Sequence, residues 1–361
     1  MSVGLMQRVC AGYRVPLFDT LAEILPGGLS LYAGDPRPEE MIDQSQKVKK
    51  ASFWHAENVH LFSGRFYLCI QRDVLIWLRQ TDPQALIMEA NMRYLRGKDA
   101  AAWMHRRGRP VIGWGLGTGS TGGVLLKQHL KLYDALITYS SAGKESYISA
   151  GFPEDRIFTA CNAAAPRPTR SMPERLPDGY DGSPIVLYVG RLQPRKRLDL
   201  LMRACAAQPP ELRPRLWIIG DGPIRAELEQ IAKSVYPQTE FFGALYGEEL
   251  TAHFDRADLF CLPGTGGLAL QQAMASALPL IAAEADGTQA DLVRPENGIQ
   301  VKPGDEQELT GAITKMLSDP GKLRKMGKES FRIVKEEINL EAMAAVFARA
   351  VAYVQREGLR I

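Results

Sequence analysis

Two basic side chains, Arg191 and Lys196, lie five residues apart just after a run of apolar residues. The run 185–189 has the composition of a buried strand, and it stops at Gly190, where a turn is expected. On a loop between a strand and a helix, two cations at this spacing can converge on one doubly charged anion. The alternative is a solvated basic turn, because the segment 191–197 carries further basic residues.

A glycine-rich segment after the apolar run 259–263 is the second candidate for ligand binding. Its glycines would let a ligand approach the backbone closely. The helix expected to begin near Leu268 would offer unpaired N–H groups and the positive end of its dipole to a phosphate. The residues of this segment are Gly264, Thr265, Gly266, Gly267 and Leu268.

The elements that must position these residues are a series of short strands, each ending in glycine. Helix-length segments with apolar residues at three- and four-residue spacing separate them, which predicts βαβ units and a parallel sheet. Ligands bind outside the carboxyl ends of such strands, so the glycines would mark the rim of a crevice. For any single glycine, an ordinary turn is the simpler alternative. The four are Gly190, Gly220, Gly243 and Gly264.

The composition is that of a globular protein with room for two domains: 361 residues, of which 45% are hydrophobic and 24% charged. A net charge of +3 is too small to indicate nucleic-acid binding. The five cysteines are dispersed and form no CxxC pair, which argues against disulfides or a metal site and favours a reducing compartment. We find no signal-peptide pattern and no apolar run long enough to predict a membrane span, so we expect a cytoplasmic protein.

The prolines between 163 and 184 predict an interdomain linker. In the first half, we expect a helix over 66–78 and a glycine-rich loop over 115–123 after the strand 110–114. The predicted division is an N-terminal domain 1–163, a linker 164–183, a C-terminal domain 184–339 and a terminal helix within 340–361.

The second half resembles the retaining glycosyltransferases of family 4, which have the two-domain GT-B architecture. The resemblance covers most of residues 184–335, and the first half matches more loosely, through 13–18, 114–115 and 161–163. It is carried by Val189-Gly190-Arg191-Leu192 with Lys196, Gly220-Asp221-Gly222-Pro223, Phe242-Gly243, Leu262 to Leu268, Gln271 to Ala275, Pro279 to Ala282, Asn297-Gly298 and Pro303-Gly304-Asp305.

The resemblance implies an α/β fold of two Rossmann-like domains that face a central cleft, with the C-terminal helix crossing back to the first domain. It implies a nucleotide-diphosphate sugar, such as a UDP- or GDP-sugar, as the donor, and no cofactor or metal. Arg191 and Lys196 would be catalytic because they neutralise the departing diphosphate. The proton of the acceptor hydroxyl would pass to the leaving phosphate on the front face of the sugar.

The same resemblance assigns the remaining site residues. The donor-binding residues would be Gly190, Gly243, Gly264, Thr265, Gly266, Gly267, Leu268 and Gln272. Candidates for the acceptor or the cleft would be Gly12, Tyr13, Arg14, Gly115, Leu116 and Gly117.

Three positions depart from the family pattern. The family usually has two glutamates with seven residues between them, where this chain has Gly264 and Gln272, and many members have a histidine where it has Leu116. Gln272 can still hydrogen-bond to a ribose hydroxyl, whereas Gly264 offers only its backbone. A catalytically weak nucleotide-sugar-binding partner of another transferase is therefore an alternative function. An epimerase or phosphorylase has less support.

The implied acceptor is a hydroxyl of a glycan, a lipid-linked sugar or a small molecule. Residues 93–131 carry eight Lys or Arg against one acid, Asp99, with apolar residues between them. Such a surface could contact an anionic membrane peripherally, at its inner face. A solvated helical face beside a core strand is the alternative, and the glycine-rich loop within the segment favours it.

Overall fold

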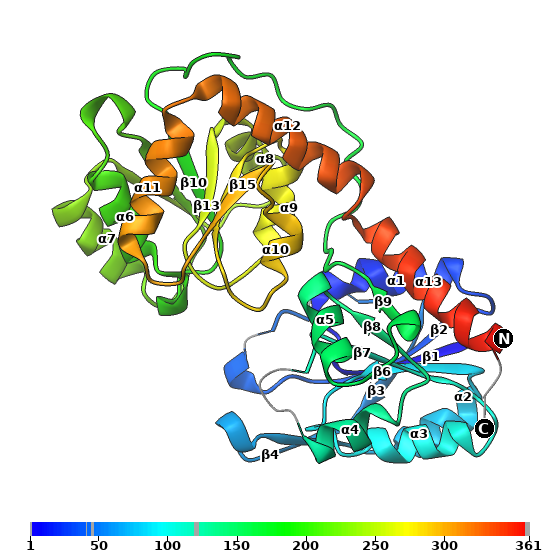
Figure 1. Cartoon of the computed structure of the whole chain (residues 1–361). Coiled ribbons are helices and arrows are strands. Elements are labelled where there is room, and N and C mark those ends of the chain that lie inside the picture. Colours follow the sequence, from blue (N-terminus) through cyan, green and yellow to red (C-terminus); the bar gives the residue numbers. More distant parts are fainter. Residues whose placement is uncertain (1, 41, 45–46, 119–122, 358–361) are drawn as a thin grey trace. The chain divides into compact units, whose positions relative to one another are not determined.

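The computed structural model describes residues 2–40, 42–44, 47–118 and 123–357, and the chain folds as two compact units (Figure 1). The first unit consists of Met1–Ala164 together with Leu340–Ile361, and the second consists of Ala165–Asn339. The chain therefore returns to its first unit at its end. Each unit is an α/β structure built on one parallel sheet.

The sheet of the first unit has seven strands among the described residues, and every neighbouring pair is parallel. These strands are short runs of apolar residues that are mostly buried, as expected where helices cover both faces of a sheet. In spatial order they are β3 (Ser52–Ala56), β2 (Leu29–Gly34), β1 (Val3–Val9), β6 (Ala85–Glu89), β7 (Val111–Gly115), β8 (Ala135–Thr138) and β9 (Ile157–Thr159).

Helices cover the two faces of this sheet and define two cores (Figure 1). One core lies under α1 (Val15–Ile24) and α13 (Leu340–Glu357), which pack on each other and bury Phe18 and Phe347. The other contains Trp77, Trp103 and Tyr147 and lies under four further helices. These are α2 (Val74–Thr81), α3 (Gly97–His105), α4 (Val124–Leu130) and α5 (Ser141–Ser149).

A two-stranded antiparallel hairpin accompanies the first sheet and overturns the expected helix over 66–78. Strand β4 (Asn58–Leu61) pairs with β5 (Leu68–Gln71), the turn η3 (Gly64–Phe66) lies between them, and the helix α2 begins only at Val74. Asp73, in a left-handed conformation with φ 63°, separates β5 from α2. Pairing with β4, a contact with another segment, decides the structure of 68–71 over its local helical pattern.

The second unit has a six-stranded parallel sheet over its described residues. In spatial order its strands are β12 (Thr239–Gly243), β11 (Arg215–Ile219), β10 (Ile185–Val189), β13 (Leu259–Leu262), β14 (Leu280–Ala283) and β15 (Gly298–Val301). The four glycine-terminated runs expected from the sequence form β10, β11, β12 and β13 of this sheet.

The helices of the second unit follow the strands in βαβ order. They are α6 (Leu198–Ala206), α7 (Arg225–Val235), α8 (Gly247–Arg256), α9 (Leu268–Ala275), α10 (Gln289–Leu292), α11 (Glu306–Leu317) and α12 (Pro320–Glu336). Side chains cap the beginnings of two of them: Asp305 accepts from Glu308 N at 2.9 Å, and Asp319 accepts from Lys322 N at 2.9 Å.

The expected linker 164–183 is not a free connection but part of the second unit from Ala165 onward. Arg170 forms a bidentate ion pair with Asp255, at 2.5 and 2.8 Å. Arg175 donates to the carbonyls of Ala257 and Phe254 at the end of α8. The prolines prevent regular structure here, and the arginines fix the resulting coil to the unit.

The strand orders show where a ligand site is expected in each unit. In the first sheet the chain starts at β1, proceeds outward through β2 and β3, and then returns to β6 on the other side of β1. In the second sheet it does the same from β10, returning to β13. Such topological switch points, at the carboxyl ends of β1 and β6 and of β10 and β13, are where parallel sheets bind ligands.

Candidate active site

The loop between β10 and α6 carries the predicted cations at the switch point of the second unit. It starts at Gly190, forms the turn η5 (Pro194–Lys196) and ends at Arg197. Arg197 has a left-handed conformation with φ 54°, and its guanidinium pairs with Asp199 at 3.1 Å. That ion pair holds the beginning of α6, so Arg197 serves the loop's structure.

Lys196 contacts the loop that follows β13. Its Nζ donates a hydrogen bond to the carbonyl of Thr265, and a Cβ added at Gly266 would lie 2.6 Å from this nitrogen. Burial, and next the charge of Arg195, lower the pKa of Lys196 to about 8. Arg191, at the beginning of the same loop, is partly buried, and its carbonyl accepts from Tyr188 Oη at 3.2 Å.

Arg195 belongs to the same site, which the sequence analysis did not indicate. Its Nη1 donates to Thr265 Oγ1 at 3.3 Å, and its carbonyl accepts from Thr265 N at 3.2 Å. A second donor of Arg195, Nε, forms a hydrogen bond to Gln193 Oε1 at 2.9 Å. The only signal in the sequence was that Arg195 lies within the basic run.

Gly264 is enclosed between the loop that follows β10 and the loop that follows β13. A Cβ at Gly264 would lie 2.2 Å from the carbonyl oxygen of Arg195 and 2.7 Å from Cα of Lys196, closer than real Cβ atoms come to such atoms. The two loops are thus in backbone contact at this point. The glutamate that the family usually has here would not fit between the two loops. The glycine in the sequence therefore accompanies their close approach.

Helix α9 begins directly behind these loops. Its N-cap residue is Gly267, which has no side chain to cap the first N–H groups of the helix. Leu268 is 41% exposed at the first position, and Gln272 is exposed one turn later. The dipole of α9 therefore adds positive potential beside Lys196 and Arg195.

The loop between β14 and α10 completes the site and was also missed. Gln289 is buried, and its Nε2 donates to the carbonyl of Gly266 at 2.7 Å, while its Oε1 has no hydrogen-bond partner among the described residues. Thr288 donates its hydroxyl to Asp286 at 2.6 Å and holds the turn. The Oε1 of Gln289 is itself enclosed, so the contact that Gln289 makes to the site is the hydrogen bond that holds the carbonyl of Gly266.

The ends of β10, β11 and β12 lie in line beside the site. Gly190 N donates to the carbonyl of Ile219 at 2.9 Å, and Gly220 N donates to the carbonyl of Gly243 at 2.7 Å. The glycines identified from the sequence therefore lie at neighbouring strand ends. Asp221 follows Gly220 and accepts from Gly222 N at 2.7 Å, and α7 begins only at Arg225.

In the first unit, the acceptor candidate Arg14 is only 5% exposed. Its guanidinium donates to Asn162 Oδ1 at 2.7 Å and lies 5.0–5.3 Å from the ring centres of Tyr13, Trp114 and Tyr139. These contacts join the end of β1 to the ends of β7, β8 and β9. Arg14 therefore fixes the rim of the first sheet.

The other first-unit candidates lie on two loops at the same carboxyl edge. Gly12 N donates to the carbonyl of Asp43 at 2.7 Å, and Tyr13 is 44% exposed. Leu116 is 50% exposed. It lies between Gly115, at the end of β7, and Gly117, in the described part of the glycine-rich loop. Residues 119–122 of that predicted loop lie outside the described residues.

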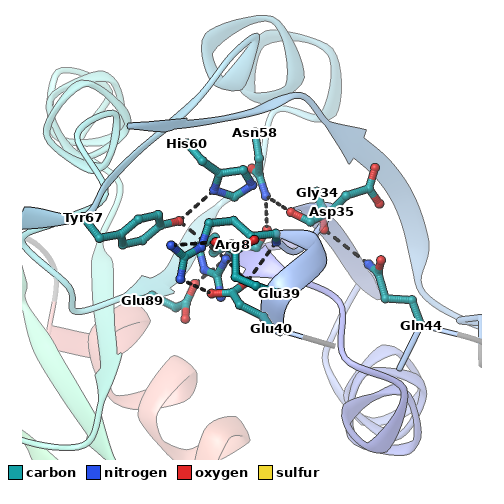
Figure 2. A network of polar contacts seen from close by, with 11 residues as sticks. Arg8, Gly34, Asp35, Glu39, Glu40, Gln44, Asn58, His60, Tyr67 and Glu89 are labelled. Atoms are coloured by element: carbon teal, nitrogen blue, oxygen red, sulfur yellow. Dashed lines mark hydrogen bonds and ion pairs between the residues drawn. The ribbon is translucent and has the colours of Figure 1, made fainter. Parts of the chain in front are cut away.

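A polar network fills the switch point of the first unit, around Arg8 on β1 (Figure 2). Its guanidinium pairs with Glu40 at 2.8 Å, and its carbonyl accepts from Asn58 Nδ2 at 2.7 Å. The Tyr67 hydroxyl lies 3.5 Å from Arg8 Nη1 and 2.9 Å from His60 Nδ1. None of these residues was among the acceptor candidates, because the network depends on contacts of Arg8 with segments 32 to 59 residues away in the chain.

Glu89, at the end of β6, faces this network. Its carboxyl accepts a hydrogen bond from the backbone N–H of Arg8. Burial raises the pKa of Glu89 to about 7, despite the opposing effect of that hydrogen bond and of the Arg8 charge. The switch point of the first unit thus holds a carboxyl that is partly protonated near neutral pH.

The basic segment 93–131 is divided between core and surface. Trp103, Leu126 and Leu130 are buried, while Val124 and Leu125 on α4 are 72% and 71% exposed. Arg96 pairs with Asp99 and Arg109 with Asp82, both at 2.6 Å. Among the described helices, none is long and apolar enough to cross a membrane.

The architecture matches solved glycosyltransferase structures over nearly the whole chain. A lipopolysaccharide outer core galactosyltransferase, WaaB, superimposes with a TM-score of 0.70 at 16% identity and covers 98% of this chain and 99% of its own. HepE of Anabaena, solved in complex with UDP, gives a TM-score of 0.70 at 15% identity, with 98% and 100% covered. The predicted GT-B fold is confirmed.

The second unit carries the more specific resemblance. Residues 177–332 match the family model of glycosyl transferases group 1. The sulfoquinovosyl transferase of Arabidopsis thaliana is 33% identical over 159 residues, which are 42% of this chain and 30% of that protein. A GDP-mannose-dependent alpha-mannosyltransferase of Mycobacterium tuberculosis is 34% identical over 200 residues, 53% of this chain and 50% of that protein. The chain thus spans at most half the length of these relatives.

Proposed function

We propose that the protein is a retaining glycosyltransferase that moves a sugar from a nucleotide-diphosphate sugar to a hydroxyl of a glycan, a lipid-linked sugar or a small molecule. The observation that carries this proposal is the contact between the loops 191–197 and 264–267 at the β10–β13 switch point. That contact places Lys196 and Arg195 beside the beginning of α9. Cations and a helix N-terminus together form a site for a diphosphate.

In this proposal the residues stabilise the leaving group. As the bond between the anomeric carbon and the phosphate oxygen breaks, negative charge develops on the diphosphate, and Arg191 and Lys196 neutralise it. The leaving phosphate oxygen takes the proton of the acceptor hydroxyl, whose oxygen forms the new bond on the same face of the sugar. Gln272, which is exposed on α9, would hydrogen-bond to a ribose hydroxyl of the donor.

The relatives support a nucleotide sugar without fixing its base. One is named for its dependence on GDP-mannose, and one structural neighbour was solved with UDP. Thermal shift with UDP, GDP, TDP and ADP tests the donor site, since a bound nucleotide raises the melting temperature by mass action. Release of the same nucleotide from its sugar conjugate, with and without acceptor, then tests transfer. A protein that no nucleotide stabilises would contradict the proposal.

We further propose that the reaction needs no metal, because protein cations take the role of Mg²⁺. Activity should survive EDTA. Loss of activity in EDTA with recovery on adding Mg²⁺ or Mn²⁺ would overturn this part. We also propose that the protein is cytoplasmic. If its acceptor is lipid-linked, it would contact the inner face of a membrane peripherally, through 93–131 or another surface.

One observation favours a second candidate, a weak nucleotide-sugar-binding partner of another transferase. Gly264 has no room for a carboxylate, and Leu116 stands where many relatives have a histidine. Both changes would lower turnover more than binding. The second candidate predicts nucleotide binding with no transfer to any acceptor and no slow hydrolysis of the donor.

A further inference from the structure

The β4–β5 hairpin belongs to the first unit, where β4 is labelled in Figure 1. Two aromatic side chains at its tip are exposed. Phe62 is 72% exposed and Phe66 is 65% exposed, the first just after β4 and the second at the end of η3. Phe62 also has φ 58°, a backbone conformation that bulky residues rarely adopt. A strained, exposed aromatic residue contributes nothing to the packing of the unit, which points to a role in binding.

These residues border an open hollow of about 740 Å³. It is lined by Phe62, Arg65, Phe66, Tyr67, Leu68 and Arg93, with Ser63 at its edge. The lining is mainly apolar and includes two arginines and no acidic residue. Within the described chain neither arginine pairs with a carboxylate, and Arg65 stacks 4.8 Å from the ring centre of Phe66. An apolar hollow with two unneutralised cations fits a molecule that has an apolar part and an anionic group.

The hollow adjoins the switch point of the first unit. Tyr67 lines it, and the hydroxyl of Tyr67 reaches Arg8 and His60 (Figure 2). The segment that holds Arg93 leaves β6 directly after Glu89 and bonds to β5, with Cys69 N donating to the carbonyl of Arg93 at 2.9 Å. A ligand in the hollow would therefore extend toward Glu89.

We infer that this hollow binds the lipid end of the acceptor, a lipid that carries a phosphate and is presented at a bilayer surface. Phe62 and Phe66 enter the apolar layer, Arg65 and Arg93 bind the phosphate, and the hydroxyl to be glycosylated lies toward Glu89. The inference rests on the proposed function insofar as it makes this lipid an acceptor. Lipid binding itself requires no donor, so it is tested separately.

The experiment measures binding of the full chain to vesicles by co-sedimentation, without nucleotide. Vesicles of phosphatidylcholine alone are compared with equimolar phosphatidylcholine and phosphatidylglycerol. We expect binding to the anionic vesicles that exceeds binding to the neutral ones by about tenfold, since two arginines contribute to it. The double variant Arg65→Gln/Arg93→Gln should lose this preference. The double variant Phe62→Asn/Phe66→Ser should lose about tenfold or more in binding to both.

We expect both double variants to fold as the wild type does, because all four side chains are exposed. Asn also tolerates the left-handed conformation at position 62. Val124→Ser/Leu125→Ser tests the competing membrane contact through the basic segment 93–131, because it removes two equally exposed apolar residues from that segment. If the hollow is the lipid site, this variant should bind as wild type does. A phosphatidylglycerol with short chains, dispersed as monomers, distinguishes one lipid in the hollow from the bilayer surface. It should protect peptides 62–68 from hydrogen exchange.

Three results of the vesicle experiment would overturn the inference. They are no binding to anionic vesicles, unchanged binding of the Phe62/Phe66 variant, or a loss that falls on the Val124/Leu125 variant instead. Competition by an acidic peptide with equal potency would assign the hollow to a protein partner and would also overturn it. Nucleotide stabilisation, measured on the same variants, should be unchanged. If nucleotides fail to bind while lipid binds as expected, the proposed function fails and the lipid site stands.

Discussion

At the scale of single residues, the protonation state of Lys196 links the site to pH. Because the pKa of Lys196 is lowered to about 8, this lysine is charged below that pH and increasingly neutral above it. Affinity for a nucleoside diphosphate should therefore fall as pH rises through about 8, approaching tenfold per pH unit. Titration calorimetry across this range checks it. Lys196→Arg should remove the fall, and an equal fall in that variant would assign it to another group.

The cations and Gln272 should differ in the effect of their removal. Arg191→Ala and Lys196→Ala each remove a charged donor whose interaction strengthens in the transition state, so transfer should slow by roughly 10²–10³. Gln272→Ala should weaken donor binding by about 1–3 kcal/mol, and Gln272→Glu should be tolerated. Steady-state kinetics with the identified donor measure both. Near wild-type rates in both cation variants would show that the diphosphate site is wrong.

Glu89 gives the first unit its own pH dependence. Its pKa is raised to about 7 from 4.5, so between these values the folded protein binds more protons than the unfolded chain does. Stability of the first unit should then decline as pH rises from 4.5 to 7, by about 1–3 kcal/mol. Hydrogen exchange of first-unit peptides at both pH values measures this. Glu89→Gln should show a smaller decline, and an equal decline would contradict the assigned cause.

At the scale of elements, the contact between the loops after β10 and β13 leaves no space at position 264. Gly264→Ala would place its Cβ against the backbone of Arg195 and Lys196, so it should cost about 1–3 kcal/mol and weaken nucleotide binding. Gly311 on α11 is the matched control, because a Cβ there meets nothing within 4 Å. Gly311→Ala should stabilise the unit by about 0.5–1 kcal/mol. Equal melting temperatures for the two variants would refute the close approach.

The sequence predicted the second unit better than the first for a physical reason. Its strands, such as β10 and β13, are continuous apolar runs closed by glycine, a signal that is local. Pairing with β4 decides the structure of 68–71, and the apolar pattern within 66–78 does not show that pairing, so the helix predicted there was wrong. The same limit applies to the site. The spacing of Arg191 and Lys196 indicated an anion site, but the contacts of Arg195 and Gln289 exist only after two loops meet.

At the scale of the whole molecule, the first unit depends on α13. Phe347 is fully buried on that helix and packs edge-on against Trp114, with ring centres 4.9 Å apart. Phe347→Ala should destabilise the first unit by about 3–5 kcal/mol and leave the second unit unchanged. Phe331→Ala on α12 should do the reverse, because Phe331 is buried in the second unit. Hydrogen exchange resolved by unit checks both, and a shared loss of protection in either variant would show that the units unfold together.

That dependence has a consequence for synthesis. The ribosome produces Met1–Ala164 first, but the core under α1 stays open until α13, beginning at Leu340, has been made. The intervening 165–339 segment contains all of its own sheet and can fold earlier. The usual order, in which the N-terminal domain is finished first, is therefore reversed. The nascent first unit presents an uncovered apolar face for the length of an entire domain, which makes it the part of the chain that chaperones would be expected to protect.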